Sequence, residues 1–264
     1  MPVYIDQLNR EVTIVENPSR IISLVPSQTE LLYDLGLEEE VVGITKFCVH
    51  PTTWFRNKTR IGGTKNINPE KITALQPDLV IANKEENVKE QVEELAKNLP
   101  VWVSDVNTLN DAIRMITAVG EITGKKEKAE TIAAQIEKEF IELTHPSADG
   151  HLRTCYLIWK DPYMTVGGDT LIHQILAKAG FSNIFKNNKR YPEVDIKELQ
   201  SLDCELLLLS SEPYPFNQKH ITELQAQLPS TKIILVDGEM FSWYGSRLLK
   251  APRYLTNLHH QIRP

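Results

Sequence analysis

Short runs of apolar residues alternate along this chain with longer stretches in which apolar residues recur every three or four positions. The runs favour strands and the stretches favour amphipathic helices, and their alternation is typical of βα units around a parallel sheet. Runs such as 21–25 (IISLV) and 206–210 (LLLLS) have no polar alternation, which predicts strands covered by helices on both faces. We expect a hairpin across 3–15 and strands at 20–25, 41–45, 79–82, 101–104, 154–159, 206–210 and 233–236.

The order of apolar positions in residues 70–105 recurs in residues 197–237. A pattern that is repeated only once is too short for a solenoid, which needs at least three stacked units. Two related lobes are the simpler interpretation. The matched pairs, at one constant shift, are Ile72 with Leu199, Leu75 with Leu202, Leu79 with Leu206, Val80 with Leu207 and Ile81 with Leu208.

The segment 124–146, between the two halves, predicts one amphipathic helix, because its apolar residues are spaced three or four apart between Gly124 and Pro146. A helix of about 20 residues would span roughly 30 Å and act as a stiff strut. The alternative is an ordinary surface helix of a single large α/β domain. The expected division is an amino-terminal α/β lobe at 1–123, a linking helix at 124–146 and a carboxyl-terminal α/β lobe at 147–264.

Composition and charge exclude several classes of protein. The 264 residues are 41% apolar and 24% charged, as in ordinary globular proteins. A formal charge of -6 disfavours nucleic acid as a partner, and no apolar stretch approaches the roughly 20 residues of a membrane span. The start, MPVYIDQLNR, lacks an apolar export segment and a lipid-attachment cysteine, so we expect a cytoplasmic protein for the chain as written. Three cysteines, an odd number, predict reduced thiols.

In open α/β sheets, ligands bind beyond the carboxyl ends of the strands. After the first expected strand, Ser27 and Glu30 match the S-x-x-E capping box of a helix start. The next such loop contains Lys46, Phe47, Cys48 and His50.

Cys48 and His50, two residues apart, would point the same way on an extended segment and could reach one metal ion. Two ligands are too few for a structural zinc site, so a plain polar loop is the alternative. A Cys–His nucleophile pair is a further alternative.

The second half carries many aromatic residues in its expected loops. They lie beside Pro, Gly, Lys and Asp, a mixture typical of loops, and they suit a large, flat, partly apolar ligand. Lys160, Arg247, Lys46 and Arg190 could meet its carboxylates, amides or phosphates. The plain alternatives are that Trp159 covers the core, that Arg247 pairs with Glu239, and that VGGD at 166–169 forms a turn with Asp169 as a helix cap. The candidate aromatics are Trp159, Tyr163, Tyr191, Tyr214, Phe216, Phe241, Trp243 and Tyr244.

The chain resembles the bilobal substrate-binding proteins of ABC importers for vitamin B12, haem and ferric siderophores, also called helical-backbone metal receptors. The resemblance covers nearly the whole chain. It rests on IDQLNREVTI with RIISLVPSQTELLYDLGL, on IGGTKNINPEKITALQPDLVIA, on the central helix, and on GGDTLIHQILAKAGFSNIF with RYPEVDIKELQSL. The vitamin B12-binding branch is closest, with the aromatic-proline step at Tyr191.

The resemblance implies two Rossmann-like α/β lobes with mostly parallel sheets, joined by one long helix, with the ligand cleft between the lobes. It also implies a monomer with no intrinsic cofactor, periplasmic if the chain is a mature form, that binds a corrinoid, haem or an iron chelate. One exposed acidic residue per lobe would dock on an ABC permease. Glu70 occupies the first docking position, while the second is Lys197 by the same register, with Glu198 beside it.

Three functions follow as hypotheses. The first is a non-enzymatic receptor for a metal chelate, held by the aromatic loops and the Lys46 to His50 loop. The second is a cytoplasmic chelatase or hydrolase on the same plan, with Cys48, His50 and either Glu212 or Glu239 as acid, base or metal ligands. The third is a ligand sensor that kept the fold without a permease.

Overall fold

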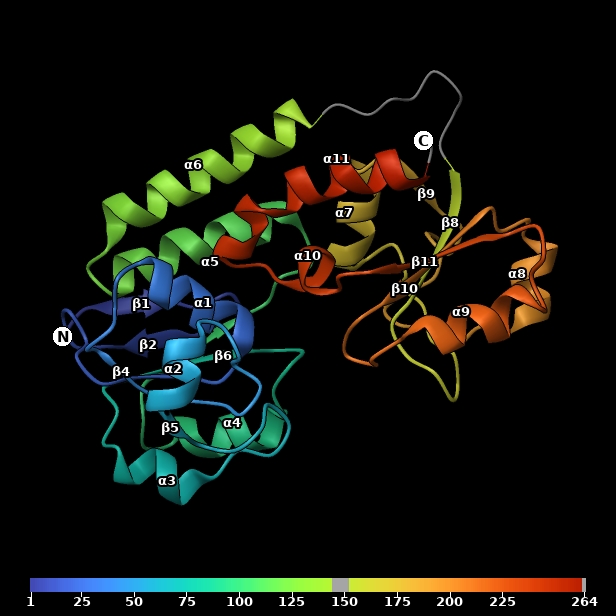
Figure 1. Ribbon diagram of the computed structural model, residues 1–264. Coiled ribbons are helices and arrows are strands. Elements are labelled where there is room, and N and C mark those ends of the chain that lie inside the picture. The colour runs from blue at the N-terminus through green and yellow to red at the C-terminus, as the bar shows by residue number, and fades with distance from the viewer. Residues whose placement is uncertain (144–151, 263–264) are drawn as a thin grey trace. The chain divides into compact units, whose positions relative to one another are not determined.

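The computed structural model describes residues 1–143 and 152–262, which form two compact units (Figure 1). Unit 1 comprises Met1–Val106, Asn110–Glu137 and Tyr244–Arg247, and unit 2 comprises Asn107–Leu109, Lys138–Trp243 and Leu248–Pro264. Each unit has its own parallel sheet, so the prediction of an α/β fold with two lobes is confirmed.

Unit 1 is built on a five-stranded parallel sheet in the order β5-β4-β3-β6-β7. An antiparallel hairpin precedes it, as the sequence predicted. The two-residue strand β5 was missed because it is too short to give a pattern. The hairpin is β1 (Val3–Ile5) and β2 (Glu11–Thr13), and the sheet consists of β3 (Ile21–Ser23), β4 (Val41–Ile44), β5 (Thr59–Arg60), β6 (Leu79–Asn83) and β7 (Val101–Ser104).

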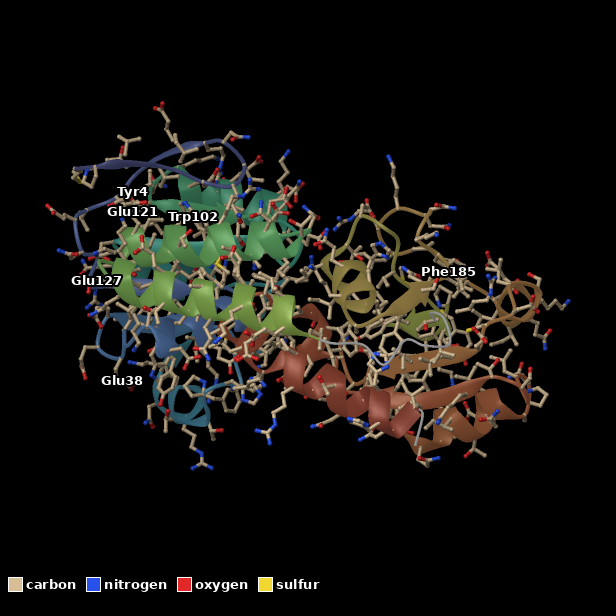
Figure 2. The ribbon with its side chains drawn as sticks, turned by 90° about the horizontal axis from the view of Figure 1, so that it is seen from above. Tyr4, Glu38, Trp102, Glu121, Glu127 and Phe185 are labelled. Atoms are coloured by element: carbon tan, nitrogen blue, oxygen red, sulfur yellow. The ribbon has the colours of Figure 1, made fainter. Side chains whose placement is uncertain are left out.

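The helices of unit 1 cover both faces of this sheet. Val80 and Ala82 of β6 pack in one cluster with Ile72 of α3 and Val92 of α4, while the alternate residues of β6 are equally buried. Trp102 of β7, labelled in Figure 2, is fully buried. The helices are α1 (Pro26–Asp34), α2 (Thr52–Asn57), α3 (Pro69–Ala74), α4 (Lys89–Ala96), α5 (Leu109–Ile122, of which Leu109 belongs to unit 2) and α6 (Lys126–Glu142, shared between the units).

The expected linking helix exists as α6, which begins two residues after Gly124 and is 17 residues long. Its first residues pack closely on α5: a Cβ at Gly120 would come within 2.1 Å of the Ala129 Cβ. The predicted end at Pro146 lies outside the described residues, and the predicted domain limits stay a prediction.

Unit 2 repeats the same plan in a four-stranded parallel sheet, in the order β11-β10-β8-β9. Its strands are β8 (Leu152–Leu157), β9 (Phe181–Asn183), β10 (Leu206–Ser210) and β11 (Lys232–Val236). Its helices are α7 (Leu171–Lys178), α8 (Ile196–Ser201), α9 (Gln218–Gln225), α10 (Glu239–Ser242) and α11 (Ala251–Ile262). The 3-10 helix η1 (Ser246–Leu249), whose residues are divided between the units, lies between α10 and α11.

The internal repeat predicted from the sequence is visible in the elements themselves. Helix α3 and strand β6 correspond to α8 and β10 with one constant shift. The cores correspond too, since Leu207 and Leu209 pack with Leu199 of α8 and Leu224 of α9, and Phe185 completes this cluster (Figure 2). In both units the strand–helix order therefore brings the loops after the strands to one edge of the sheet.

Candidate ligand-binding site

The loop after β4 presents an aromatic ring at the carboxyl edge of the unit 1 sheet. Phe47 is 51% exposed, and the Lys46 Nζ lies 5.1 Å from the centroid of its ring. The ring packs over Gly63, where a Cβ would approach it to 3.1 Å. Because Gly63 has no side chain, the Phe47 ring can pack over it, and the Lys46 ammonium group lies next to that ring at the surface.

Cys48, in the same loop, is a core residue. Its side chain is completely buried, its Sγ accepts a hydrogen bond from the Thr29 Oγ1 at 3.1 Å, and the Thr45 Oγ1 lies 3.2 Å away. Burial raises the pKa of the thiol to about 11, so Cys48 is a neutral thiol at pH 7.

A turn leads into the segment from Cys48 to His50, and in it the Cys48 N–H donates to the Thr45 carbonyl. His50 is half-buried, whereas Cys48 is fully buried, so the two side chains do not present themselves together. Among residues 1–143 and 152–262, no group of three or more His, Cys, Asp or Glu is placed to hold a metal ion. A metal role for this pair stays a prediction.

Ser27 and Glu30 do not form the expected capping box. Helix α1 begins at Pro26 after Val25, and within the described residues no side chain caps it. Ser27 Oγ accepts the Tyr244 N–H at 2.9 Å, and the Glu30 Oε2 accepts the Arg247 Nε–H at 2.8 Å. Ser27 and Glu30 therefore bind a segment of unit 1 that is distant in sequence, and they do not cap α1.

This distant segment, Tyr244–Arg247, is fastened to unit 1 along its length. The Tyr244 hydroxyl donates to the Glu86 Oε1 at 2.6 Å, and the Ser246 hydroxyl donates to the Asp34 Oδ2 at 2.5 Å. A Cβ at Gly245 would lie 2.4 Å from the Ser27 carbonyl oxygen, so only glycine fits there. Tyr244 and Arg247, both expected to meet a ligand, are therefore almost fully buried, and Arg247 pairs with Glu30 where the sequence suggested Glu239.

In unit 2 the candidate aromatics fall into two groups. Trp159, which is 41% exposed, meets the half-buried Tyr214 edge to face with ring centroids 5.7 Å apart. Tyr214 in turn contacts Phe216 at 4.8 Å and His220 at 5.5 Å, and Phe216 belongs to the buried core. This first group forms a ladder of rings from the core to the surface.

The second group faces inward. Phe241 is fully buried, with its ring centroid 5.0 Å from that of Tyr156. Trp243 is also buried, and its Nε1–H donates to the Glu212 Oε1 at 2.9 Å. Trp159 and Tyr214 thus reach the surface, whereas Phe241 and Trp243 are buried.

The charged candidates of unit 2 have protein partners. The Lys160 Nζ lies 3.0 Å from the Glu223 Oε2, a hydrogen bond that raises the pKa of Lys160 and lowers that of Glu223. Tyr163 is half-buried against the core, and burial raises its pKa. The Arg190 guanidinium stands 5.4 Å from the centroid of the Tyr191 ring.

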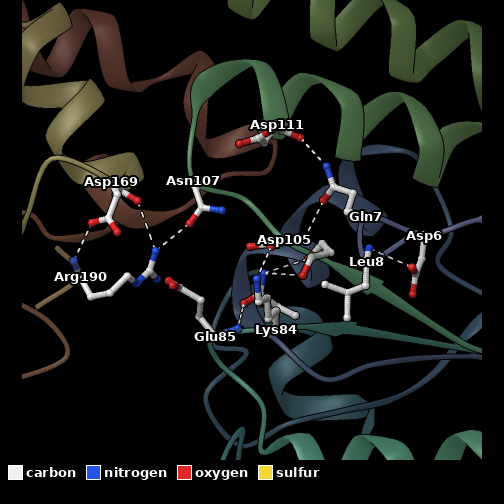
Figure 3. A network of polar contacts seen from close by, with 12 residues as sticks. Asp6, Gln7, Leu8, Lys84, Glu85, Asp105, Asn107, Asp111, Asp169 and Arg190 are labelled. Atoms are coloured by element: carbon white, nitrogen blue, oxygen red, sulfur yellow. Dashed lines mark hydrogen bonds and ion pairs between the residues drawn. The ribbon is translucent and has the colours of Figure 1, made fainter. Parts of the chain in front are cut away.

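Asp169 is not the helix cap expected from the sequence. The cap of α7 is Thr170, whose side chain accepts the His173 N–H at 3.2 Å. Asp169 instead accepts the Arg190 N–H at 2.6 Å, and the Arg190 Nη1 donates to the Asn107 Oδ1 at 2.8 Å (Figure 3). Arg190 has a φ of 55°, and this pair of anchors holds it in that left-handed conformation.

Glu212, in the loop after β10, is a partly buried carboxylate. Its Oε1 accepts hydrogen bonds from the Ser242 hydroxyl at 2.8 Å and from Trp243. Burial raises the pKa of Glu212, and the neighbouring charge of Glu239, at the start of α10, raises it further. The hydrogen bonds oppose that shift without cancelling it.

A surface hollow of about 340 Å³ lies elsewhere in unit 1, between the hairpin and the start of β7. Its lining includes Arg10, Thr13, Lys97 and Pro100, which lie at the amino end of that strand. The loops that follow the strands are at the opposite edge, so we assign no ligand to this hollow.

His220 is a member of the ring ladder that sequence reasoning missed. The spacing Asn217-x-x-His220 at the start of a helix was the available signal, since α9 begins with a capping box made by these two residues.

Comparison with known proteins identifies the class. The family model of periplasmic binding proteins matches residues 21–230, and the chain belongs to that family. A vitamin B12-binding protein from Pectobacterium carotovorum is 28% identical over 252 residues, which cover 94% of this chain and 90% of the relative. The resemblance stated from the sequence is thereby confirmed.

Two solved structures share the fold. The periplasmic vitamin B12 binding protein of Vibrio cholerae superposes with a TM-score of 0.77 at 20% identity, covering 94% of this chain and 98% of that one. A periplasmic heme-binding protein from Roseiflexus sp. RS-1, in its apo form, gives 0.78 at 22% identity, covering 92% and 97%. At these identities the likeness shows the fold alone.

The expected cytoplasmic localisation is wrong. The matching family is that of periplasmic binding proteins, and both structural neighbours are periplasmic. The inference failed because it rested on where the given sequence begins. Within the described residues, no helix is long and apolar enough to cross a membrane.

We predict that Glu30→Gln destabilises unit 1 by about 3–5 kcal/mol, because it breaks a buried ion pair from one side. Both side chains of the pair are less than a tenth exposed. Urea unfolding followed by circular dichroism measures the loss. Glu94→Gln, which removes the exposed pair with Lys97, is the control and costs less than about 1 kcal/mol. Equal effects of the two variants would contradict the assignment.

We also predict that Glu212→Gln changes the pH dependence of stability. Because the pKa of Glu212 in the folded protein lies above its ordinary value of 4.5, the free energy of unfolding falls as pH rises through that window. The amide keeps an acceptor for Ser242 and Trp243 but cannot ionise. The variant is therefore the more stable protein at pH 7, and the difference disappears below pH 4.5. Urea titrations at several pH values test this, and parallel curves would refute it.

Proposed function

We propose that this protein is a non-enzymatic receptor that binds a metal chelate, of the corrinoid, haem or ferric siderophore class, for an ABC importer. The observation that carries the proposal is the family match over residues 21–230 together with the vitamin B12-binding relative. The ligand is cargo, and the protein needs no resident cofactor to hold it.

The exposed rings support this proposal. Trp159 with Tyr214 in unit 2, and Phe47 with Lys46 in unit 1, stand in loops after strands, where ligands of open α/β sheets bind. A flat, partly apolar macrocycle gains contact area from such rings at low entropic cost. Of the other candidates, Tyr163, Tyr191, Lys160 and His50 border these loops, whereas Phe216, Phe241 and Trp243 act from the core as supports.

The enzyme hypothesis has less support. It relied on Cys48 as an acid, base or nucleophile, and a fully buried thiol with a raised pKa is poorly suited to each role. Glu212 is engaged by two donors, and Lys160 by Glu223.

We further propose that Glu70 and Glu198 dock on the permease. Both are exposed and lie in the first turn of a short helix, where the helix dipole favours a negative charge. The caps Asn68 and Asp195 accept the N–H groups of Lys71 and Glu198 at 2.9 and 2.8 Å, which fixes these turns. The order of charges is reversed, Glu70-Lys71 in α3 and Lys197-Glu198 in α8, so the acidic group of unit 2 sits one residue later.

Titration with cyanocobalamin, haemin and a ferric hydroxamate, followed by tryptophan fluorescence and visible absorbance, tests the receptor function. We expect saturable quenching by one class, and an increase in Kd of about ten- to a hundredfold in Trp159→Ala, because a large aromatic contact is lost. Tyr33→Ala, equally exposed at 41% but on α1, is the control and keeps the affinity. Silence with all three probes would overturn the proposal.

Charge reversal tests the docking surface. We expect Glu70→Arg and Glu198→Arg each to lower the amount of ABC permease that the protein retains from detergent-solubilised membranes of its host, since each replaces attraction by repulsion. Ligand binding stays unchanged. The control is Glu93→Arg, an exposed site on α4. Unchanged retention by both variants would refute the docking role, and recovery of a soluble partner in its place would favour a sensor.

A further inference from the structure

His220 has a fixed hydrogen-bonding pattern. It is the third residue of α9, and its Nδ1 lies 3.0 Å from the Asn217 backbone nitrogen, which carries a hydrogen and can only donate. The Nδ1 atom is therefore the acceptor. A neutral imidazole has one acceptor and one N–H, so the hydrogen of His220 resides on Nε2.

The second contact of His220 follows from the first. Its Nε2 lies 3.2 Å from the Tyr214 hydroxyl oxygen, and because Nε2 carries the hydrogen, the Tyr214 oxygen accepts. The phenol then keeps its own hydrogen for another partner. In the described part of the chain, the contact of the Tyr214 hydroxyl is His220 Nε2, and no acceptor receives the hydroxyl hydrogen.

Tyr214 occupies a place where a ligand could use this hydrogen. Its N–H donates to the Ile158 carbonyl at 3.3 Å, which joins the loop after β10 to the loop after β8. The next residue of the latter loop is Trp159, whose exposed ring meets Tyr214 edge to face. A hydrogen-bond donor thus lies beside an exposed aromatic face.

We propose that His220 is a positioning residue that holds the Tyr214 O–H as a donor to an acceptor oxygen on the rim of the ligand, a carboxylate or a carboxamide, while the ligand's apolar surface lies on Trp159. This inference rests on the proposed receptor function and adds the chemistry that one part of the ligand presents. A ligand whose rim offers no acceptor would leave this hydrogen unsatisfied and lose affinity.

A purely structural role of His220 is the competing explanation. Its ring is 8% exposed and also packs edge to face on Phe216 at 5.3 Å, so it contributes to the core as well. The two roles differ in what they demand of Nε2: packing needs only a ring, whereas positioning needs an N–H aimed at Tyr214. Variants that replace the function of only one of the two ring nitrogens therefore distinguish the packing role from the positioning role.

The tautomer is read in the protein without ligand. Nitrogen-15 NMR of the labelled protein at pH 7 should show Nε2 of His220 protonated and Nδ1 bare, with assignment by comparison to His220→Asn. A protonated Nδ1 would overturn the proposal, because Nδ1 could not then accept from Asn217.

Binding is measured with cyanocobalamin and with haemin, both of which carry rim acceptors. Tyr214→Phe keeps the ring and should raise Kd about tenfold, the value of one hydrogen bond. His220→Asn keeps an acceptor for Asn217 but removes the donor to Tyr214, and should raise Kd by a smaller factor. The double variant should match Tyr214→Phe alone, because His220 acts through that hydroxyl. His220→Gln, which places an N–H near the Nε2 position, should restore most of the affinity.

The outcomes separate this inference from the receptor function. If the wild-type protein binds a probe and Tyr214→Phe binds it equally well, the donor role fails while the receptor function stands. Additive effects of the two substitutions would reduce His220 to a packing residue and overturn the proposal. If the wild-type protein binds neither probe, the donor role fails, whereas the receptor function fails only if the ferric hydroxamate is silent as well. Tyr33→Phe is the matched control, and thermal unfolding of every variant confirms that it is folded.

Discussion

The burial of both faces of the parallel sheets is the constraint on which the rest of the molecule depends. All five residues of β6 and all five of β10 are buried, so no functional group can face solvent from the middle of either sheet. The exposed aromatic groups of the candidate site therefore lie in the loops that follow the strands. Phe47, Trp159 and Tyr214 all lie in such loops, and this is how one architecture can carry many different ligand sites.

The fold could be predicted because its main signal is local in sequence. Unbroken apolar runs marked β6, β7 and β10, and the constant shift between α3–β6 and α8–β10 revealed the repeat. The contacts of Ser27 and Glu30 could not be predicted, since Arg247 lies 217 residues from Glu30 along the chain. A capping motif and a docking site for a distant segment use the same residues, and only the fold decides between them.

The candidate site was predicted by composition, and composition cannot tell an exposed ring from a buried one. Trp159 and Phe241 both follow strands closely, yet one is 41% exposed and the other is fully buried. The chain after β11 enters α10 within three residues, and Phe241 lies on the buried side of that helix. Cys48 shows the same limit, because a turn at Thr45 directs its side chain into the core where an extended segment would have exposed it.

The segment Tyr244–Arg247 links the completion of unit 1 to the last part of the chain. Its backbone and side chains supply partners of Ser27, Glu30, Asp34 and Glu86, although about a hundred residues of unit 2 separate it from the rest of unit 1. During synthesis, the nascent amino-terminal half emerges from the ribosome before Arg247 is translated, so the ion pair between Glu30 and Arg247 has not yet formed. This half reaches its final structure only after residue 247 has been translated, so the two halves mature together rather than in succession.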